Sequence, residues 1–359
     1  MLAYLQYAAF DIVLILWTKC NLKYNNTYHI KVGWIAEWFV FTFLAAFRYV
    51  GNHIGGADSE HYVESFLTGI KLSSEPLLYQ LNSLIRLFTE NYHIYFFVVY
   101  GIIVFGLLFF AKNIFDKNTN WLSLFFFFNI YCTSFGVMRQ WLAISIGMVA
   151  FVMLKKEKDI MALFIALIST GVHFTMIVYV AIILLYIFFR HNHYRINYRF
   201  FLCYAFMINI LFVFISDLFI RFIGSTEYRN YVNINSLSDV SWRGYIPTII
   251  FLIICLFFEK DIRLGNKNDE IGLVFLCINL SLMYATVALG MFRLTVLFWP
   301  IRAYMIDRVR PVLARKFVWE KENRYFIIGL YDFAVLFICI VYMWRTVGNS
   351  ALPYVFSFY

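Results

Sequence analysis

Residues 93–111 read HIYFFVVYGIIVFGLLFFA, an apolar segment without Asp, Glu, Lys or Arg that ends directly before Lys112. A helix that crosses a lipid bilayer needs roughly 20 mostly apolar residues. The segment therefore predicts a transmembrane helix, and its neighbours in the sequence decide how many more there are.

Runs of this kind recur along the whole chain. They lie at 2–18, 32–47, 93–111, 121–137, 140–154, 160–172, 174–189, 200–220, 246–258, 271–290, 294–307 and 325–344. They predict an all-α polytopic membrane protein with about 12 transmembrane helices. The number of transmembrane helices is 10–12, because several runs are short. A tight hairpin over 121–154 is the alternative to two separate spans.

The composition also indicates that lipid surrounds most of the chain. Hydrophobic residues make up 62% of the 359 residues and charged residues only 14%, whereas a soluble domain is about half apolar and about a quarter charged. This excludes a soluble enzyme, a disordered chain and a secreted disulfide scaffold. The six cysteines form no CxxC pair and are interpreted as small apolar residues.

The net charge of +9 is explained by the orientation of the helices in the membrane before any binding partner has to be considered. With the N-terminus outside, 21 of the 30 basic residues fall in cytoplasmic connections, as the positive-inside rule requires. Twelve spans then place both termini outside. We expect one integral membrane domain over 1–359, with larger extracytoplasmic segments at 48–92 and 221–245, and no nucleic-acid partner.

The first outer segment contains an amphipathic stretch over 75–90. Its apolar residues Leu77, Leu78, Leu81, Leu84, Ile85 and Phe88 share one helical face. Pro76 suits a first helical turn. We predict a helix that lies in the outer membrane interface, with a packed extracellular helix as the alternative.

Three arginines occupy the expected outer ends of apolar runs: Arg48, Arg139 and Arg293. The positive-inside rule disfavours Arg there, so each needs a reason. An anionic ligand at the outer mouth supplies one, because the planar guanidinium donates paired hydrogen bonds to phosphate. The alternative is snorkelling to lipid headgroups or pairing with a local carboxylate.

Two further residues on the outer side are suited to proton transfer. His173 stands at an outer turn, and histidine titrates near neutral pH. Asp58 lies in the polar, glycine-containing loop 48–62 and would act as a general base or orient a sugar hydroxyl. A structural histidine and a solvated loop are the alternatives. His53, Asp58, Glu60 and His61 match no strong metal-binding spacing.

The sequence contains no GxxxxGK[ST], GxGxxG, HExxH or GxSxG motif. Nucleotide binding, zinc-protease chemistry and the serine-hydrolase elbow therefore have no support. Few charged residues interrupt the spans, which disfavours a proton-coupled transporter.

Four short motifs together resemble the EpsG-type family of exopolysaccharide membrane proteins, which are Wzy-like polysaccharide polymerases. They are Arg48-Tyr49-Val50-Gly51 followed by Asp58 and Tyr62, then Glu75-Pro76, then Arg139-Gln140-Trp141-Leu142-Ala143, and finally Gly171-Val172-His173-Phe174-Thr175. The resemblance covers most of the chain, in order and in topology.

The resemblance implies a polyprenyl-pyrophosphate-dependent glycosyltransferase in the bacterial plasma membrane. Its substrates are oligosaccharide units linked to undecaprenyl pyrophosphate, and the product is an O-antigen of lipopolysaccharide, a capsule or an exopolysaccharide. Membrane lipids, a flippase and a chain-length regulator are the expected partners. No cofactor and no metal site are predicted, although a metal ion stays open as an alternative.

The resemblance also implies roles for individual residues. Arg48, Arg139 and Arg293 would bind the pyrophosphate, and His173 or Asp58 would deprotonate the acceptor hydroxyl. Tyr62, Gln140 and Arg243 are expected to contact the glycan. A lipid-linked oligosaccharide flippase and a membrane O-acyltransferase that acts on the glycan are the alternative functions.

Overall fold

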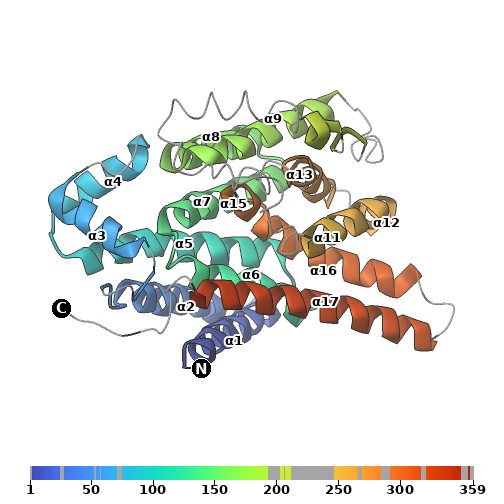
Figure 1. Cartoon of the computed structure of the whole chain (residues 1–359), viewed down its shortest axis with the longest axis horizontal. Helices are drawn as coiled ribbons and strands as arrows, with labels where there is room; N and C mark the ends of the chain where they lie inside the picture. Colours follow the sequence, from blue (N-terminus) through green and yellow to red (C-terminus); the bar gives the residue numbers. More distant parts are fainter. Residues whose placement is uncertain are drawn as a thin grey trace. The chain divides into compact units, whose positions relative to one another are not determined.

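The computed structural model describes residues 2–24, 28–51, 54–56, 58–70, 75–192, 203–205, 207–211, 246–265, 269–283, 292–316, 321–348 and 355. Most of these residues are helical, and no strand occurs among them. The all-α class predicted from the apolar runs is confirmed for this part of the chain (Figure 1).

Most of the predicted runs correspond to a helix, but the run 294–307 is divided between two helices. The helices are α1 (Leu2–Lys23), α2 (Tyr28–Ala46), α3 (Ser59–Thr68), α4 (Pro76–Arg86), α5 (Tyr92–Ile114), α6 (Trp121–Thr133), α7 (Met138–Lys155), α8 (Asp159–Val172), the short 3-10 helix η1 (Phe174–Met176), α9 (Ile177–His191), α11 (Ile246–Phe257), α12 (Glu259–Gly265), α13 (Glu270–Ser281), α15 (Phe292–Val296), α16 (Trp299–Lys316) and α17 (Lys321–Gly348). Most of the run 200–220 lies outside the described residues.

Three of the described helical segments are long and apolar enough to cross a membrane: Tyr92–Ile114, Met138–Lys155 and Phe174–His191. Shorter apolar helices add to them, among them Val32–Ala46 and Trp121–Thr133. Large apolar side chains are also exposed, with Ile160 on α8 at 87%. Apolar helices with apolar outer faces fit a membrane protein. The count of twelve spans and the outward termini stay predictions.

The chain divides into two compact units. The first comprises Met1–Ile183 and Val335–Tyr359, and the second comprises Leu184–Ala334. The boundaries fall within α9 and α17. The single membrane domain over 1–359 remains a prediction, as do its two large extracytoplasmic segments.

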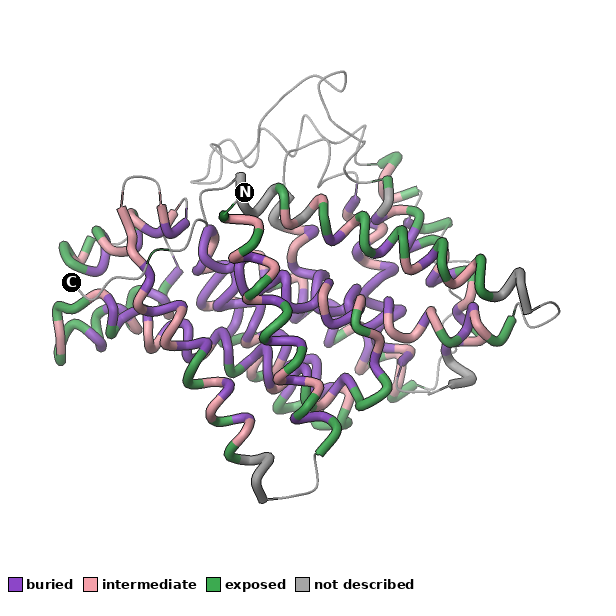
Figure 2. Tube along the Cα trace, turned by 90° about the horizontal axis from the view of Figure 1, so that it is seen from below, coloured by how far each residue is buried: buried purple, intermediate pink, exposed green. Residues whose placement is uncertain are grey.

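In the first unit, α7 packs against α5 and α8, while α2 packs against α5 and α1 against α6. Trp141, Tyr95 and Phe127 are completely buried in this core. Buried and exposed positions alternate along α1, which begins at the N-terminus marked in Figure 2, whereas α7 has no exposed position. Close helix contact depends on Gly106, where a Cβ atom would lie 2.6 Å from the carbonyl oxygen of Ser145.

Replacing Gly106 by Ala is expected to destabilise the protein by about 1–3 kcal/mol, because the added methyl group overlaps the α7 backbone. The matched control is Gly329→Ala on α17, where a Cβ atom meets no described atom within 4 Å. Alanine there is expected to be neutral or slightly stabilising, since it favours helix more than glycine does. Thermal unfolding of both purified variants checks this. Equal melting temperatures would contradict the packing argument.

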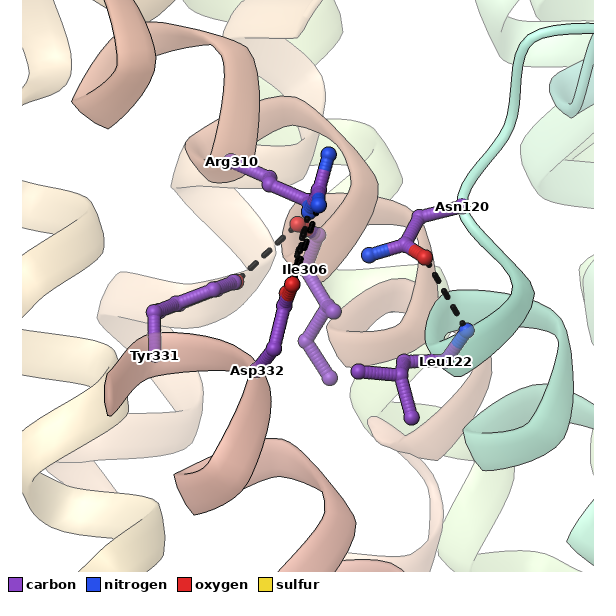
Figure 3. Close-up of polar contacts among 6 residues, drawn as sticks. All are labelled: Asn120, Leu122, Ile306, Arg310, Tyr331 and Asp332. Carbon is purple, nitrogen blue, oxygen red and sulfur yellow. Dashed lines mark hydrogen bonds and ion pairs between the residues drawn. The ribbon is translucent and has the colours of Figure 1, made fainter. Parts of the chain in front are cut away.

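The stretch 121–154 forms two helices, α6 and α7, which are connected by the short segment 134–137. Asn120 caps α6, since its side-chain oxygen accepts a hydrogen bond from the N–H of Leu122 at 3.3 Å (Figure 3). The turn carries Phe135 and Gly136, and Arg139 follows directly on α7.

The described part of the segment 48–92 contains two helices, α3 and α4. The amphipathic stretch forms α4, and Pro76 occupies its first turn as predicted. Leu78 and Ile85 are buried while Leu84, Leu87 and Phe88 are exposed, and α4 packs against α8. The position of α4 in the membrane interface stays a prediction. The sequence analysis did not anticipate α3.

In the second unit, α16 packs against α13 and α12. The helix continues beyond the predicted end of its run at residue 307 and includes Pro311. Arg310 explains part of this extension, because its guanidinium holds the Asp332 carboxylate through two nitrogens at 3.0 and 2.9 Å (Figure 3). The Tyr331 hydroxyl also donates to the carbonyl of Ile306 at 3.0 Å. Polar contacts thus join α16 to α17.

Candidate functional site

Three helix ends meet in the first unit and bring together residues that are far apart in the sequence. Glu75 precedes α4, Arg139 is the second residue of α7, and His173 directly follows α8. The end of α8 lies tightly on α4, since a Cβ atom at Gly171 would stand 2.6 Å from Leu77 Cδ1. Figure 1 shows α4 beside the end of α8.

The Glu75 carboxylate connects the other two side chains. Its Oε1 atom lies 2.6 Å from Nδ1 of His173, and its Oε2 atom lies 2.9 Å from a terminal nitrogen of Arg139. Glu75 and His173 are 4% and 2% exposed, whereas Arg139 is 12% exposed. We call these three residues the Glu75 cluster. A ligand that approaches from solvent meets Arg139 before the other two.

The helix dipoles stabilise the charges of Glu75 and of protonated His173, but they disfavour the charge of Arg139. A carboxylate is favourable at the N-terminus of α4, and a cationic imidazole is favourable at the C-terminus of α8. Arg139 stands at the N-terminus of α7, where the dipole disfavours a cation. The Glu75 carboxylate compensates for this position, and a bound phosphate would do the same, because helix N-termini also attract anions.

The contact with Glu75 also fixes the histidine ring. A carboxylate only accepts hydrogen bonds, so the Nδ1 atom of His173 carries a proton and donates to Glu75. The proton-accepting nitrogen of the neutral ring is then Nε2. This is the tautomer that a histidine needs to take a proton on one side while a carboxylate stabilises its cationic form on the other.

Glu75 and Arg139 are expected to be strongly coupled in stability. Glu75→Gln leaves a largely buried cation beside a neutral amide, and Arg139→Gln leaves the carboxylate without its ion pair. The double variant should cost less than the sum of the two single variants, by about 0.5–3 kcal/mol. A double-mutant cycle of unfolding free energies measures this coupling. Additive effects would show that the pair contributes nothing.

Arg48 is fully buried at the outer end of α2, with 1% of its side chain exposed. Its guanidinium donates to the carbonyls of Gly55 and Ala45 and to the hydroxyls of Ser59 and Tyr100. The rings of three aromatic residues surround it, each with its centroid within 5 Å: Phe96, Tyr100 and Phe135. In this structure Arg48 therefore connects Gly55 and the start of α3 at Ser59 to Tyr100 on α5. Its predicted contact with pyrophosphate stays a prediction.

The loop that Arg48 holds lies against the turn before Arg139. Ser59 Oγ lies 2.9 Å from the Phe135 carbonyl oxygen, and the Asp58 N–H points to the Gly136 carbonyl at 3.4 Å. Gly56 has φ of 119°, and a Cβ atom there would collide with the Phe135 carbonyl. Glycine is thus required for this approach. Asp58 itself precedes α3 and is half-buried.

Other predicted residues lie around Arg139. Gln140 follows it on α7 and is 3% exposed, and Tyr62 on α3 is buried. The Tyr95 hydroxyl on α5 interacts electrostatically with Tyr62 and with Arg139. Tyr62 and Gln140 are thus buried in the first unit, and their predicted contact with a glycan stays a prediction.

Two predicted residues belong to the second unit. Arg293 lies in α15, with its side chain outside the described part, and Arg243 lies outside the described residues altogether. Their place in the same site stays a prediction. His53, one of the four residues weighed as metal ligands, is also outside the described part. Within the described residues, no group of three or more His, Cys, Asp or Glu side chains is arranged to hold a metal ion.

Glu75 is the member of the cluster to which the sequence analysis assigned no role. The dipeptide Glu75-Pro76 was read only as a helix start and as part of the family resemblance. One signal in the sequence could have indicated a role for Glu75. Acidic residues are scarce in this apolar chain, and Arg139 has no acidic residue near it in the sequence to serve as a counter-ion. The pairing itself depends on how α4 packs on α8 and on where the first turn of α7 lies, which sequence spacing does not reveal.

The described residues form an apolar helical fold that fits a membrane protein, with a buried carboxylate, a buried histidine and a partly buried arginine at converging helix ends. The model of the EpsG family matches residues 34–356, so the chain belongs to the EpsG family. Membership of this family indicates a membrane protein of polysaccharide biosynthesis that is similar to polysaccharide polymerases. No curated protein and no solved structure matches the chain.

Proposed function

We propose that this protein polymerises oligosaccharide repeat units linked to undecaprenyl pyrophosphate, on the outer face of the bacterial plasma membrane. The growing chain is transferred from its lipid carrier to a sugar hydroxyl of the next lipid-linked unit. The observation that supports this best is the Glu75 cluster, which joins a proton acceptor and an anion-binding guanidinium through one carboxylate.

In the proposed reaction, Nε2 of His173 takes the proton from the acceptor hydroxyl. The oxygen then attacks the anomeric carbon of the donor sugar, and the bond from that carbon to the pyrophosphate oxygen breaks. Undecaprenyl pyrophosphate leaves with the electron pair. Glu75 stabilises the imidazolium that forms, since its Oε1 atom is 2.6 Å from Nδ1.

Arg139 is proposed to bind the departing pyrophosphate. Charge accumulates on the leaving group as the glycosidic bond breaks, and a fixed guanidinium at a helix N-terminus stabilises that charge. Because Glu75 contacts one of its terminal nitrogens, the carboxylate also sets the orientation of the planar fork. Arg293 is also proposed to bind the pyrophosphate.

Arg48 and Asp58 are proposed to have supporting roles. Arg48 positions the loop 54–58 against the turn at Phe135, which carries Arg139 into the cluster. Asp58 would orient a sugar hydroxyl, or replace His173 as the base. We favour His173, because a carboxylate partner orients its ring and links it to Arg139. Tyr62, Gln140 and Arg243 are proposed to contact the glycan.

The experiment that tests this function uses the purified full chain in lipid vesicles with undecaprenyl-pyrophosphate-linked oligosaccharide. The proposal predicts a ladder of longer lipid-linked glycans. Movement of the unchanged substrate across the bilayer would instead identify a flippase. Acyl groups added to glycans of unchanged length, in the presence of an acyl donor, would identify an O-acyltransferase.

A further inference from the structure

An apolar groove runs between α2 and α5 in the first unit. It has a volume of about 420 Å³ and is lined by Trp34, Ile35, Trp38, Phe105, Leu108, Phe109 and Lys112. This volume is within the range of about 300–1,000 Å³ that is usual for small-molecule sites. All of its lining residues except Lys112 are apolar or aromatic, so it fits a hydrocarbon chain.

The groove has a rigid wall. The Trp38 indole N–H donates to the Gly101 carbonyl at 2.7 Å, and its ring lies 3.3 Å from where a Cβ atom of Gly101 would stand. Trp38 is therefore fixed between α2 and α5. On the other side, Phe105 is half-exposed and borders the opening. The cavity is thus built by ordered side chains.

One end of the groove carries positive charge. The Lys112 ammonium is exposed and lies 5.9 Å from the centre of the Trp34 ring. Lys156 stands close by, because it donates to the Asn113 side chain and lies 5.7 Å from the centre of the Phe109 ring. The charge distribution of the sequence assigns this end of α5 to the cytoplasmic side.

We propose that this groove binds an anionic phospholipid of the cytoplasmic leaflet. One acyl chain would lie along Trp38 and Phe105, while Lys112 and Lys156 hold the phosphate group. Two ammonium groups beside an apolar groove complement a phosphate that is joined to an acyl chain. The site is separate from the Glu75 cluster, which the same charge distribution places at the other ends of the helices, and it does not depend on the proposed reaction.

Native mass spectrometry of the purified full chain in detergent tests this site. Phosphatidylglycerol is expected to bind more tightly than phosphatidylcholine. Lys112→Gln should weaken phosphatidylglycerol binding about five-fold, which corresponds to one ammonium at a lipid headgroup. Lys117→Gln removes the same charge from an exposed turn five residues after Lys112, outside the residues that line the groove, and should leave binding unchanged.

Three outcomes would overturn the proposal. Equal affinities for the two lipids would show that the site does not select charge. An equal loss in Lys117→Gln would reduce the effect to general electrostatic attraction. Tighter, Lys112-dependent binding of a polyprenyl monophosphate would assign the groove to a polyprenyl carrier instead of a phospholipid.

Discussion

Replacing His173 by Gln is expected to lower the initial rate of glycosyl transfer by about 10²–10⁴-fold, the usual contribution of a general base. Glutamine retains a polar side chain that reaches Glu75, so the packing between α4 and α8 should survive. It has no group that accepts a proton near neutral pH. The rate of undecaprenyl pyrophosphate release in vesicles measures the effect.

The matched control for this variant is His61→Gln. His61 lies on α3, its side chain is 72% exposed, and its Nδ1 atom is 4.0 Å from a carboxylate oxygen of Glu64. It should retain the wild-type rate. A His173→Gln protein that folds normally and polymerises at the wild-type rate would remove His173 from the reaction and leave Asp58 as the candidate base.

Replacing Arg139 by Lys is expected to lower kcat by about 10²–10³-fold, with a smaller change in KM. Lysine preserves the positive charge but has no planar fork, so it cannot hold Glu75 and a phosphate oxygen at the same time with the geometry of arginine. The loss should fall mainly on kcat, because the leaving group becomes most negative in the transition state.

Arg86→Lys is the corresponding control. Arg86 lies at the exposed end of α4 and donates to the Leu67 carbonyl at 3.3 Å, away from the Glu75 carboxylate. Its substitution should affect neither kinetic constant. If Arg139→Lys instead lowered only the melting temperature and kept kcat, Arg139 would be a structural partner of Glu75 and not a ligand of the pyrophosphate.

Much of the fold follows from apolar runs alone. The segment 93–111 becomes α5, and the run 140–154 becomes the centre of α7, because a backbone in an apolar environment must satisfy its own hydrogen bonds. The amphipathic stretch after Pro76 becomes α4 for the same local reasons. The extension of α16 beyond residue 307 could not be predicted from apolar runs. In this extension Arg310 forms an ion pair with Asp332, which lies on α17.

The candidate site was only partly accessible from the sequence. Arg139 and His173 stood out because each is polar at the outer end of an apolar run. Their connection through Glu75 depends on three helix ends that converge after folding. Arg48 has the same sequence signature as Arg139, yet its guanidinium is enclosed by carbonyls and aromatic rings. Sequence position indicates that an arginine needs a partner, but not which partner it finds.

Counting the glycosidic bonds that the protein forms tests the polymerase function most directly. Purified protein in vesicles receives lipid-linked oligosaccharide, and both the glycosidic bonds formed and the undecaprenyl pyrophosphate released are quantified. We expect one released carrier for each new bond, and a loss of both in His173→Gln and Arg139→Lys at normal protein abundance. Glycan growth without carrier release, or an unchanged yield in both variants, would contradict it.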